Sequence, residues 1–276
     1  STLNKKKIEK IPFELPPFKE QNLIAHILDT LDTQIRRTEE VIAKLEQVKQ
    51  GLLTDLLTRG IDENGELRPS PEEAPELYKD SPLGRIPRGW QTATIGQFAT
   101  INTGGRDTQD QVPNGRYPFF VRSQNVEQID SYSFDCTAVL TAGDGVGTGK
   151  VFHYLNGKFD AHQRVYVIHG FPDHIDPRLF FEYFRVKFIE RVQLYSAKNT
   201  VDSVRMAMIA DMLCPIPPLA EQHQVTQIFG VVDTKLESER ALGNKLRHQK
   251  VALMDDLLTG RVRVTPLLEQ AERTVG

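Results

Sequence analysis

Two short polar clusters in the middle of the chain carry side chains that can read the edges of DNA bases. Each cluster adjoins an apolar run with the composition of a β-strand. Arginine can hold guanine through two parallel hydrogen bonds, and asparagine or glutamine can hold adenine in the same way. The candidate base-reading residues are Arg122, Ser123, Gln124, Asn125, His162, Gln163 and Arg164. The alternative for both clusters is a polar strand end without a ligand.

Lys198, Asn199 and Arg205 lie near one another in a predicted loop after an aromatic-rich segment. Lys198 and Arg205 suit contacts to phosphates, which fix the position of a protein on DNA without reading the sequence. The middle of the chain, residues 90–215, contains 12 Lys and Arg against 13 Asp and Glu, and the whole chain has a net charge of −3. Any DNA-binding surface is therefore local, or a partner supplies much of the phosphate contact.

A glycine-rich stretch at residues 143–150 also adjoins a predicted strand, and it includes Thr148 and Lys150. It is similar to a nucleotide-binding P-loop but lacks two required residues. Asp144 stands where the first glycine is needed, and Val151 replaces the Ser or Thr that binds magnesium. We expect instead a turn whose backbone amides can approach a DNA phosphate. A plain hairpin turn is the alternative.

The other chemistry-bearing residues indicate no catalytic or metal centre. No pair of histidines shows the spacing of a zinc site with a cysteine, and no Ser/His/Asp or Cys/His set stands out. The sequence therefore predicts no cofactor, no metal and no enzyme activity. Cys136 and Cys214 are expected to be reduced core thiols, as in a cytosolic protein. No apolar run approaches the roughly 18 residues that a membrane span needs.

An internal repeat must position these candidates. Residues 16–21, Pro-Pro-Phe-Lys-Glu-Gln, recur as Pro-Pro-Leu-Ala-Glu-Gln at 217–222, and the match continues without a gap to residues 55–58 and 256–259. In each copy apolar residues recur at a 3-4 spacing, which is typical of a coiled-coil seam. Polar residues interrupt both seams at equivalent positions, namely Thr38 and Glu239, and Lys49 and Lys250. Two ordinary amphipathic helices are the alternative, but about 40 residues make a helix of about 60 Å.

Between the copies the composition changes to short β-branched and aromatic runs, with a hairpin signal at Asn156-Gly157. Residues 177–195 then carry apolar side chains at helical spacing. The predicted fold class is α+β, with one mixed α/β domain inserted between two long helices. Because a single domain links the end of the first helix to the start of the second, the helices should form an antiparallel coiled coil.

The repeat and the middle domain resemble the specificity (S) subunit of type I restriction–modification systems. The resemblance rests on the Pro-Pro-x-x-Glu-Gln helix entries, on Leu56–Arg68 and Leu257–Val264, and on Tyr117–Glu127, Leu140–Tyr154, His162–Tyr166 and Lys198–Arg205. It implies a non-catalytic subunit whose target-recognition domain reads one half of a split target in double-stranded DNA. Its spacer helices would bind methyltransferase (M) subunits, which use S-adenosylmethionine, and a restriction (R) subunit would cut unmodified DNA.

The resemblance also gives the domain boundaries and the competing functions. The family alternates two recognition domains with two spacers, whereas this chain resembles a half-length form with one recognition domain. We expect a remnant of a preceding recognition domain at 1–17, spacer helices at 18–59 and 216–260, a linker at 60–89, the recognition domain at 90–215 and a frayed tail at 261–276.

A homodimer held at the helix seam, with Lys49, Lys250 and Glu239 setting its register, would read an interrupted palindrome. The alternatives are a fragment of a longer subunit, a coiled-coil scaffold whose middle domain binds another protein, and a nucleotide hydrolase.

Overall fold

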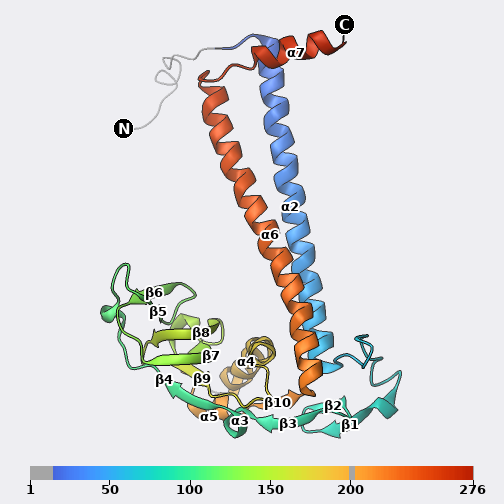
Figure 1. Cartoon of the computed structure of the whole chain (residues 1–276), viewed down its shortest axis with the longest axis vertical. Helices are drawn as coiled ribbons and strands as arrows, with labels where there is room; N and C mark the ends of the chain where they lie inside the picture. Colours follow the sequence, from blue (N-terminus) through green and yellow to red (C-terminus); the bar gives the residue numbers. More distant parts are fainter. Residues whose placement is uncertain (1–14, 199–202, 276) are drawn as a thin grey trace. The chain divides into compact units, whose positions relative to one another are not determined.

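The computed structural model of the chain describes residues 15–198 and 203–275 (Figure 1). Most of the expected remnant of a preceding domain, residues 1–14, and Asn199 lie outside the described residues, and so does the side chain of Lys198. The chain divides into two compact units, one of residues 1–49 with 231–276 and one of residues 50–230. Two long helices, α2 (Phe18–Thr58) and α6 (Leu219–Leu258), run through both units.

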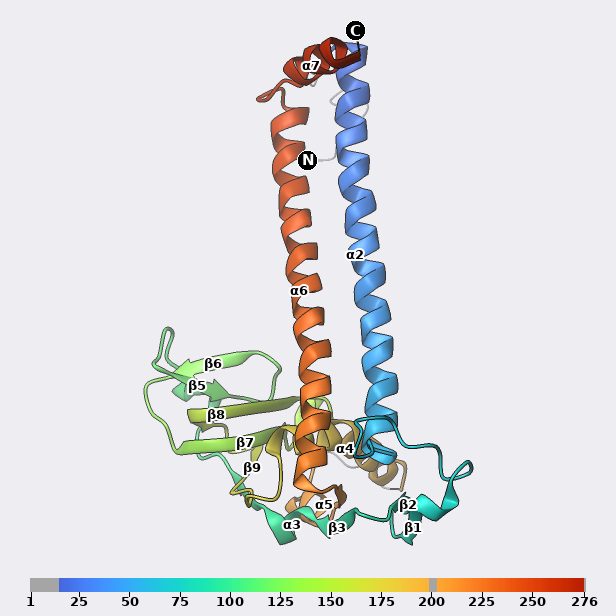
Figure 2. The ribbon, with the colours of Figure 1, turned by 45° about the vertical axis from the view of Figure 1, so that its right-hand side comes forward.

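In the first unit, α2 and α6 form an antiparallel pair, seen side by side in Figures 1 and 2. Arg247 binds Glu39 at 2.6 Å, and Arg240 binds Glu46 at 2.7 Å. Residue numbers that increase along α2 are therefore paired with residue numbers that decrease along α6. This order confirms the predicted antiparallel coiled coil. Within the described residues no helix is both long enough and apolar enough to cross a membrane.

The repeat gives this coil an internal two-fold symmetry. Lys49 pairs with Asp233, and Lys250 pairs with Asp32. Each partner in the first pair lies one repeat length from its counterpart in the second, so the two ion pairs are equivalent. The lysines at the polar seam positions thus fix the register between α2 and α6 of one chain. That Lys49, Lys250 and Glu239 also set the register of a dimer stays a prediction.

The end of the chain is more ordered than the expected frayed tail. A helix, α7 (Thr265–Val275), follows α6 after a short connection. Val264 before it is buried against Ile24 and Leu257. Arg263 holds the Glu20 carboxylate through two hydrogen bonds of 2.9 and 2.8 Å. These contacts fasten the connection to the start of α2, which explains why the prediction failed.

The segment expected to be an extended linker forms a small hairpin in the second unit. Strands β1 (Tyr78–Ser81) and β2 (Gly84–Pro87) pair antiparallel after a short 3-10 turn, η1 (Pro75–Leu77). Tyr78 and Ile86 are buried. Proline-rich composition signalled turns correctly here, but it did not reveal that two buried side chains stabilise a fixed structure.

The middle of the chain, residues 90–215, is built on a six-stranded sheet with the order β4-β9-β7-β8-β5-β6. Its strands are β4 (Thr100–Thr103), β5 (Tyr117–Phe120), β6 (Val126–Ile129), β7 (Phe134–Ala142), β8 (Phe152–Ala161) and β9 (Val165–His169). All neighbours are antiparallel except β5 and β8. A second ladder joins β3 (Gln91–Thr94) to β10 (Leu213–Ile216). The remaining short elements are α3 (Ile95–Phe98), α5 (Met206–Ala210), η2 (Thr108–Asp110) and η3 (Gly145–Gly147).

The predicted hairpin turn at Asn156-Gly157 is wrong. Both residues lie inside β8 and pair with Thr137 and Cys136 of β7. Gly157 has a φ of 122° within the strand, a backbone conformation that L side chains rarely adopt. A turn there would break a ladder that continues to Phe159, so strand pairing overrides the local signal. The connection from β7 to β8 is instead the glycine-rich stretch.

The core of the second unit forms between the sheet and the aromatic helix α4 (Pro177–Lys198). Phe180, Phe184 and Phe188 stack along one face of α4, with ring centroids 5.5 and 4.7 Å apart. They pack with sheet residues and with the ends of α2 and α6 that belong to this unit, including Leu53 and Phe229. This shared core supports the strand ends that carry the candidate site.

Candidate nucleic-acid interface

The structure brings two of the predicted polar clusters together at one carboxylate. Arg122 follows β5, Arg164 precedes β9, and Asp144 follows β7. The Asp144 carboxylate lies 3.0 Å from Arg122 Nη1 and 3.5 Å from Arg164 Nε. The side chains of Arg122 and Arg164 are 46% and 63% exposed, so both guanidinium groups remain accessible to a ligand.

Close backbone packing holds the glycine-rich stretch in this cluster. The Gly143 amide donates to the Arg164 carbonyl at 2.7 Å, and the Val204 amide donates to the Gly143 carbonyl at 2.7 Å. A Cβ atom on Gly147 would lie 2.4 Å from the Arg122 carbonyl oxygen, so glycine is required there. Segments near residues 122, 143, 164 and 204, which are far apart in the sequence, therefore meet.

The glycine-rich stretch uses several of its own polar groups internally. The Thr148 hydroxyl and amide both donate to the Gly145 carbonyl, and the Lys150 amide donates to the Gly147 carbonyl. The backbone amides of Thr148 and Lys150 already have acceptors. Binding of a DNA phosphate by these two amides is therefore less favourable. The Lys150 side chain is exposed, and its contact with DNA stays a prediction.

A second ion pair, which was not predicted from the sequence, lies beside the cluster. Arg106 Nε donates to Asp160 Oδ2 at 3.0 Å, and Asp160 is fully buried. Gln163 reaches the same segment: its side-chain amide donates to Asp107 at 3.1 Å, and its backbone amide donates to the Arg106 carbonyl at 2.8 Å. The polar pair Arg106-Asp107 after β4 was the available signal, but only the strand order β4-β9-β7 brings it next to Gln163.

His162 has a structural role in this arrangement. It is 4% exposed, and its Nδ1 accepts a hydrogen bond from the Arg164 amide at 3.0 Å. Burial lowers its pKa, and the positive charge of Arg122 lowers it further. The neutral imidazole therefore holds the backbone of Arg164 in place. A direct contact between His162 and a DNA base would need this side chain to leave its buried position.

The remaining candidates are exposed at the rim of the same region or lie elsewhere. Ser123, Gln124 and Asn125 are exposed; the Ser123 hydroxyl donates to the Asn125 carbonyl at 3.0 Å, which orders the turn. Arg205 is exposed and precedes α5, next to the backbone contact of Val204. Lys198 ends α4, and its side chain lies outside the described part of the chain.

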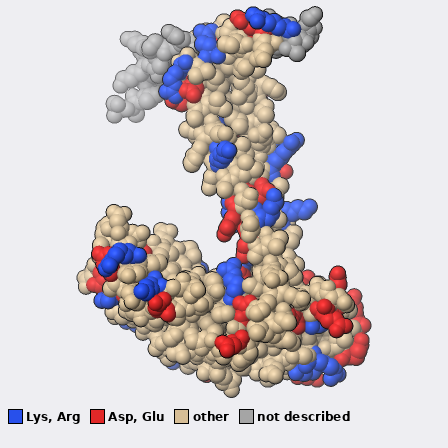
Figure 3. All heavy atoms as spheres, viewed as in Figure 1, with Lys and Arg blue, Asp and Glu red and all other residues tan. Residues whose placement is uncertain are grey.

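Charges around the site are balanced rather than uniformly positive. Figure 3 shows that Lys and Arg side chains lie among Asp and Glu over much of one face of the molecule, with Asp and Glu gathered at its lower right. Each arginine of the cluster has an acidic neighbour, as Arg106 has Asp160 and Arg122 has Asp144. Among the described residues no group of three His, Cys, Asp or Glu could hold a metal ion. The region therefore offers specific hydrogen-bond donors and little general attraction for a polyanion.

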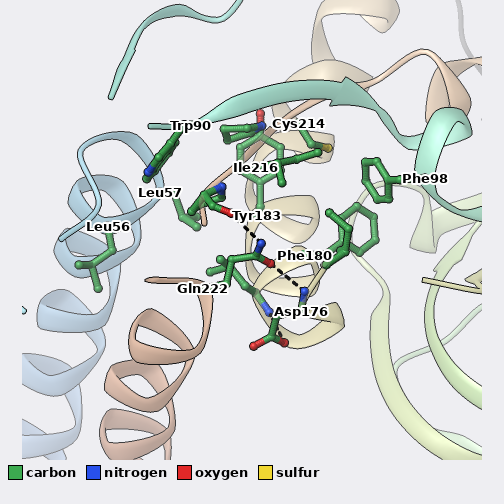
Figure 4. A pocket seen from close by; sticks show the side chains of 14 residues that line it. Leu56, Leu57, Trp90, Phe98, Asp176, Phe180, Tyr183, Cys214, Ile216 and Gln222 are labelled. Atoms are coloured by element: carbon green, nitrogen blue, oxygen red, sulfur yellow. Dashed lines mark hydrogen bonds between the residues drawn. The ribbon is translucent and has the colours of Figure 1, made fainter. Parts of the chain in front are cut away.

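The repeated Glu-Gln pair fastens the helix entry in the second unit, beside the small cavity drawn in Figure 4. The Gln222 amide donates to the His174 and Pro217 carbonyls at 2.9 and 2.8 Å, and its oxygen accepts from the Asp176 amide at 2.7 Å. Trp90 Nε1 donates to Glu221 at 3.1 Å. The cavity, of about 30 Å³, has room for only one or two water molecules.

Acid should destabilise the middle of the chain through three of its histidines, of which His162 is buried and His153 and His169 are half-buried. Burial lowers the pKa of His153, His162 and His169. In the unfolded chain these groups return to a pKa of about 6.5 and bind protons first. Their contribution to stability is thus complete above about pH 6.5 and is lost as pH falls through the lowered values of the folded state. We expect the melting temperature to fall between pH 7.5 and 5.

The variant His153→Phe isolates this effect, because His153 already packs against the Phe120 ring at 4.9 Å. Phenylalanine removes the titrating group and keeps the packing, so the acid-induced fall in melting temperature should be smaller. Exposed His26 provides the control variant His26→Ala. An equal fall in all three proteins would contradict the assignment.

Comparison with known proteins identifies the class to which this fold and site belong. Residues 1–47 and 87–248 match the family model described as "Type I restriction modification DNA specificity domain". The chain belongs to this family, which confirms the resemblance seen in the sequence. It is 31% identical over 158 residues to the type I restriction enzyme EcoDI specificity subunit of Escherichia coli, a match that covers 57% of this chain and 34% of that protein.

Solved structures show the same fold. The type I restriction–modification S subunit from M. genitalium superposes with a TM-score of 0.64 at 12% identity, over 87% of this chain and 61% of that one. A chain from a type I restriction–modification complex superposes with a TM-score of 0.55 at 14% identity, over 93% of this chain and 63% of that one. This chain thus spans about a third of the E. coli relative and less than two thirds of each solved chain.

Proposed function

We propose that the chain is a DNA-reading subunit, itself without catalytic activity, of a type I restriction–modification enzyme. Its recognition domain, residues 90–215, reads one half of a split target, and its spacers, 18–59 and 216–260, bind methyltransferase subunits. A restriction subunit joins the assembly to cut unmodified DNA. The observation that carries the proposal is the pair of exposed arginines, Arg122 and Arg164, held together at one end of the sheet. Arginine is the side chain best suited to reading guanine in the major groove.

Reading a second half-site requires a second recognition domain. The repeat supports the presence of a second docking site for such a domain. Gln21 donates to the Pro16 carbonyl at 2.8 Å, as Gln222 does to the Pro217 carbonyl. Glu20 is held by Arg263, as Glu221 is held by Arg68. Because each helix entry repeats the other, a second domain can dock at Gln21 as the first docks at Gln222. We propose that a second copy of the chain supplies it in a two-fold homodimer.

The experiment is to express the chain with methyltransferase subunits and to map methylated adenines in the DNA of the cell. An interrupted palindrome is the expected motif, because identical domains related by a two-fold axis read inverted repeats. An asymmetric motif would exclude the homodimer and leave the DNA-reading role intact. Methylation with no sequence motif, or none that depends on this chain, would contradict the proposed function.

The charge balance of the region favours one other function, a scaffold whose middle domain binds a protein. Salt dependence separates the two. Phosphate contacts release counterions, so DNA affinity should fall as salt rises. If the assembled enzyme does not bind duplex DNA even at low salt, the scaffold function is favoured.

A further inference from the structure

Asp144 occupies a position where the side chain of an aspartate ordinarily caps the turn that follows it. It precedes the 3-10 turn η3, and an aspartate at such a position commonly accepts a hydrogen bond from an amide of the following turn. Here the side chain makes no capping hydrogen bond with that turn. Its two oxygens instead approach guanidinium groups from two other loops, Arg122 through Oδ1 and Arg164 through Oδ2.

We propose that Asp144 is a positioning residue that aims Arg122 and Arg164 at base edges and holds both away from phosphates. This inference rests on the proposed function and names a residue that sets its specificity. Asp144 itself touches no base in this scheme. It acts through the two arginines whose orientation it fixes.

The backbone around Asp144 is suited to such a role because it is held on both sides. Asp144 forms an isolated β-bridge with Ser203, and neighbouring Gly143 is hydrogen-bonded to the backbone of Arg164. On the other side, Gly147 packs directly against the Arg122 carbonyl. The Asp144 side chain is only 22% exposed. The carboxylate therefore has a fixed place from which to orient two longer and more exposed side chains.

The atoms used in the two ion pairs leave the arginines able to read bases. Arg122 approaches Asp144 through Nη1, so its edge formed by Nε and Nη2 remains for another acceptor. Arg164 approaches through Nε, which leaves the fork of its two terminal nitrogens. Either edge offers the two parallel donors that guanine O6 and N7 accept. A guanidinium already held by a carboxylate also loses less conformational freedom when it binds.

The charge of Asp144 works against indiscriminate binding. Two neighbouring arginines without an acid would attract any phosphate, and such contacts supply affinity that does not depend on sequence. One carboxylate between them offsets one of the two positive charges. It thereby weakens contacts with phosphates more than the shaped, bidentate contacts with a base. An ion pair at an exposed surface contributes little to stability, so the fold should not depend on Asp144.

The test compares Asp144→Asn with Asp130→Asn. Asp130 is exposed and pairs with Arg116 at 3.5 Å in the same domain, so the control removes the same charge from an acid–arginine pair outside the cluster. Each full-length variant, assembled with methyltransferase subunits, is used to select sequences from a pool of random duplex DNA. We expect Asp144→Asn to bind the unselected pool about fivefold more tightly at low salt. Enrichment of the preferred motif should fall about tenfold, since one well-placed bidentate pair discriminates by about that factor.

A second variant separates orientation from charge. Arg122→Lys keeps the positive charge but lacks the planar fork, so it should lose motif enrichment without the gain in affinity for the unselected pool. Melting temperatures of the wild-type chain, Asp144→Asn and Asp130→Asn should agree. Undiminished motif enrichment by Asp144→Asn, or an equal loss in Asp130→Asn, overturns the inference while the proposed function stands. If the wild-type assembly enriches no motif, the proposed function fails and the inference fails with it.

Discussion

Replacing Glu221 by alanine is expected to destabilise the second unit by about 3–5 kcal/mol, the usual cost of leaving one member of a buried ion pair without its partner. Glu221 is 6% exposed. Its carboxylate accepts two hydrogen bonds from Arg68, at 2.5 and 2.9 Å, and one each from the Trp90 indole at 3.1 Å and the Ile61 amide at 3.0 Å. Alanine leaves all of these donors, one of them charged, without this acceptor.

Urea unfolding followed by Trp90 fluorescence measures the effect, since Trp90 is the single tryptophan and contacts the altered residue. Glu237→Ala is the control, because Glu237 is an exposed acid on the same helix and should change stability little. Glu20→Ala removes the repeat-related acid, whose partners are Arg263 and Thr265 in the first unit. It should leave the Trp90 transition in place. A Glu221→Ala transition within about 0.5 kcal/mol of wild type would contradict the prediction.

Among substitutions that add one methyl group to a glycine near the candidate interface, Gly104→Ala should reduce the stability of the fold the most. Its Cβ would lie 1.9 Å from the Ala161 carbonyl oxygen, and a backbone atom cannot yield as a flexible side chain can. The segment after β4 must then move away from the end of β8, and the contact of Arg106 with buried Asp160 would be lost. We expect a loss of about 3 kcal/mol, at the upper end of the usual cost of overpacking.

The neighbouring glycine provides the control for this variant. A Cβ on Gly105 would meet nothing within 4 Å. Gly105→Ala should therefore fold and melt as the wild-type chain does, and it should keep its affinity for DNA. Thermal unfolding of the two variants side by side is the measurement. Equal melting temperatures would show that β4 and β8 are not held as closely as described.

The helices were predictable because their signal is periodic and occurs twice. The 3-4 spacing of apolar residues indicated the seam, and the single inserted domain indicated antiparallel packing. The pairing of Lys49 with Asp233 could not be derived before the register was known, since a seam position alone names no partner. With the register in hand, the repeat requires that Lys250 meet Asp32, as it does.

The candidate site was predictable only in part because it depends on strand order. Arg122 and Arg164 stood out through their residue type and their places at strand ends. Asp144 was noticed only as the residue that breaks a P-loop pattern, and its role emerges when β9, β7, β8 and β5 lie in that order. Asn156-Gly157 misled for the opposite reason. A strong local preference for a turn yields when both flanking segments pair with the same neighbouring strand.

The paired ion bridges of the coil constrain how such a protein can change length in evolution. A residue inserted into α2 between Asp32 and Lys49 would change the spacing of these two residues, while their partners on α6 keep theirs. Only one of the two bridges could then keep its partner. Only matched insertions in both repeat copies, in steps that return apolar side chains to the seam, preserve both bridges. Seven residues in each copy would lengthen the coil by about 10 Å. The reach of the coil therefore changes in discrete increments, each requiring two coordinated changes in one gene.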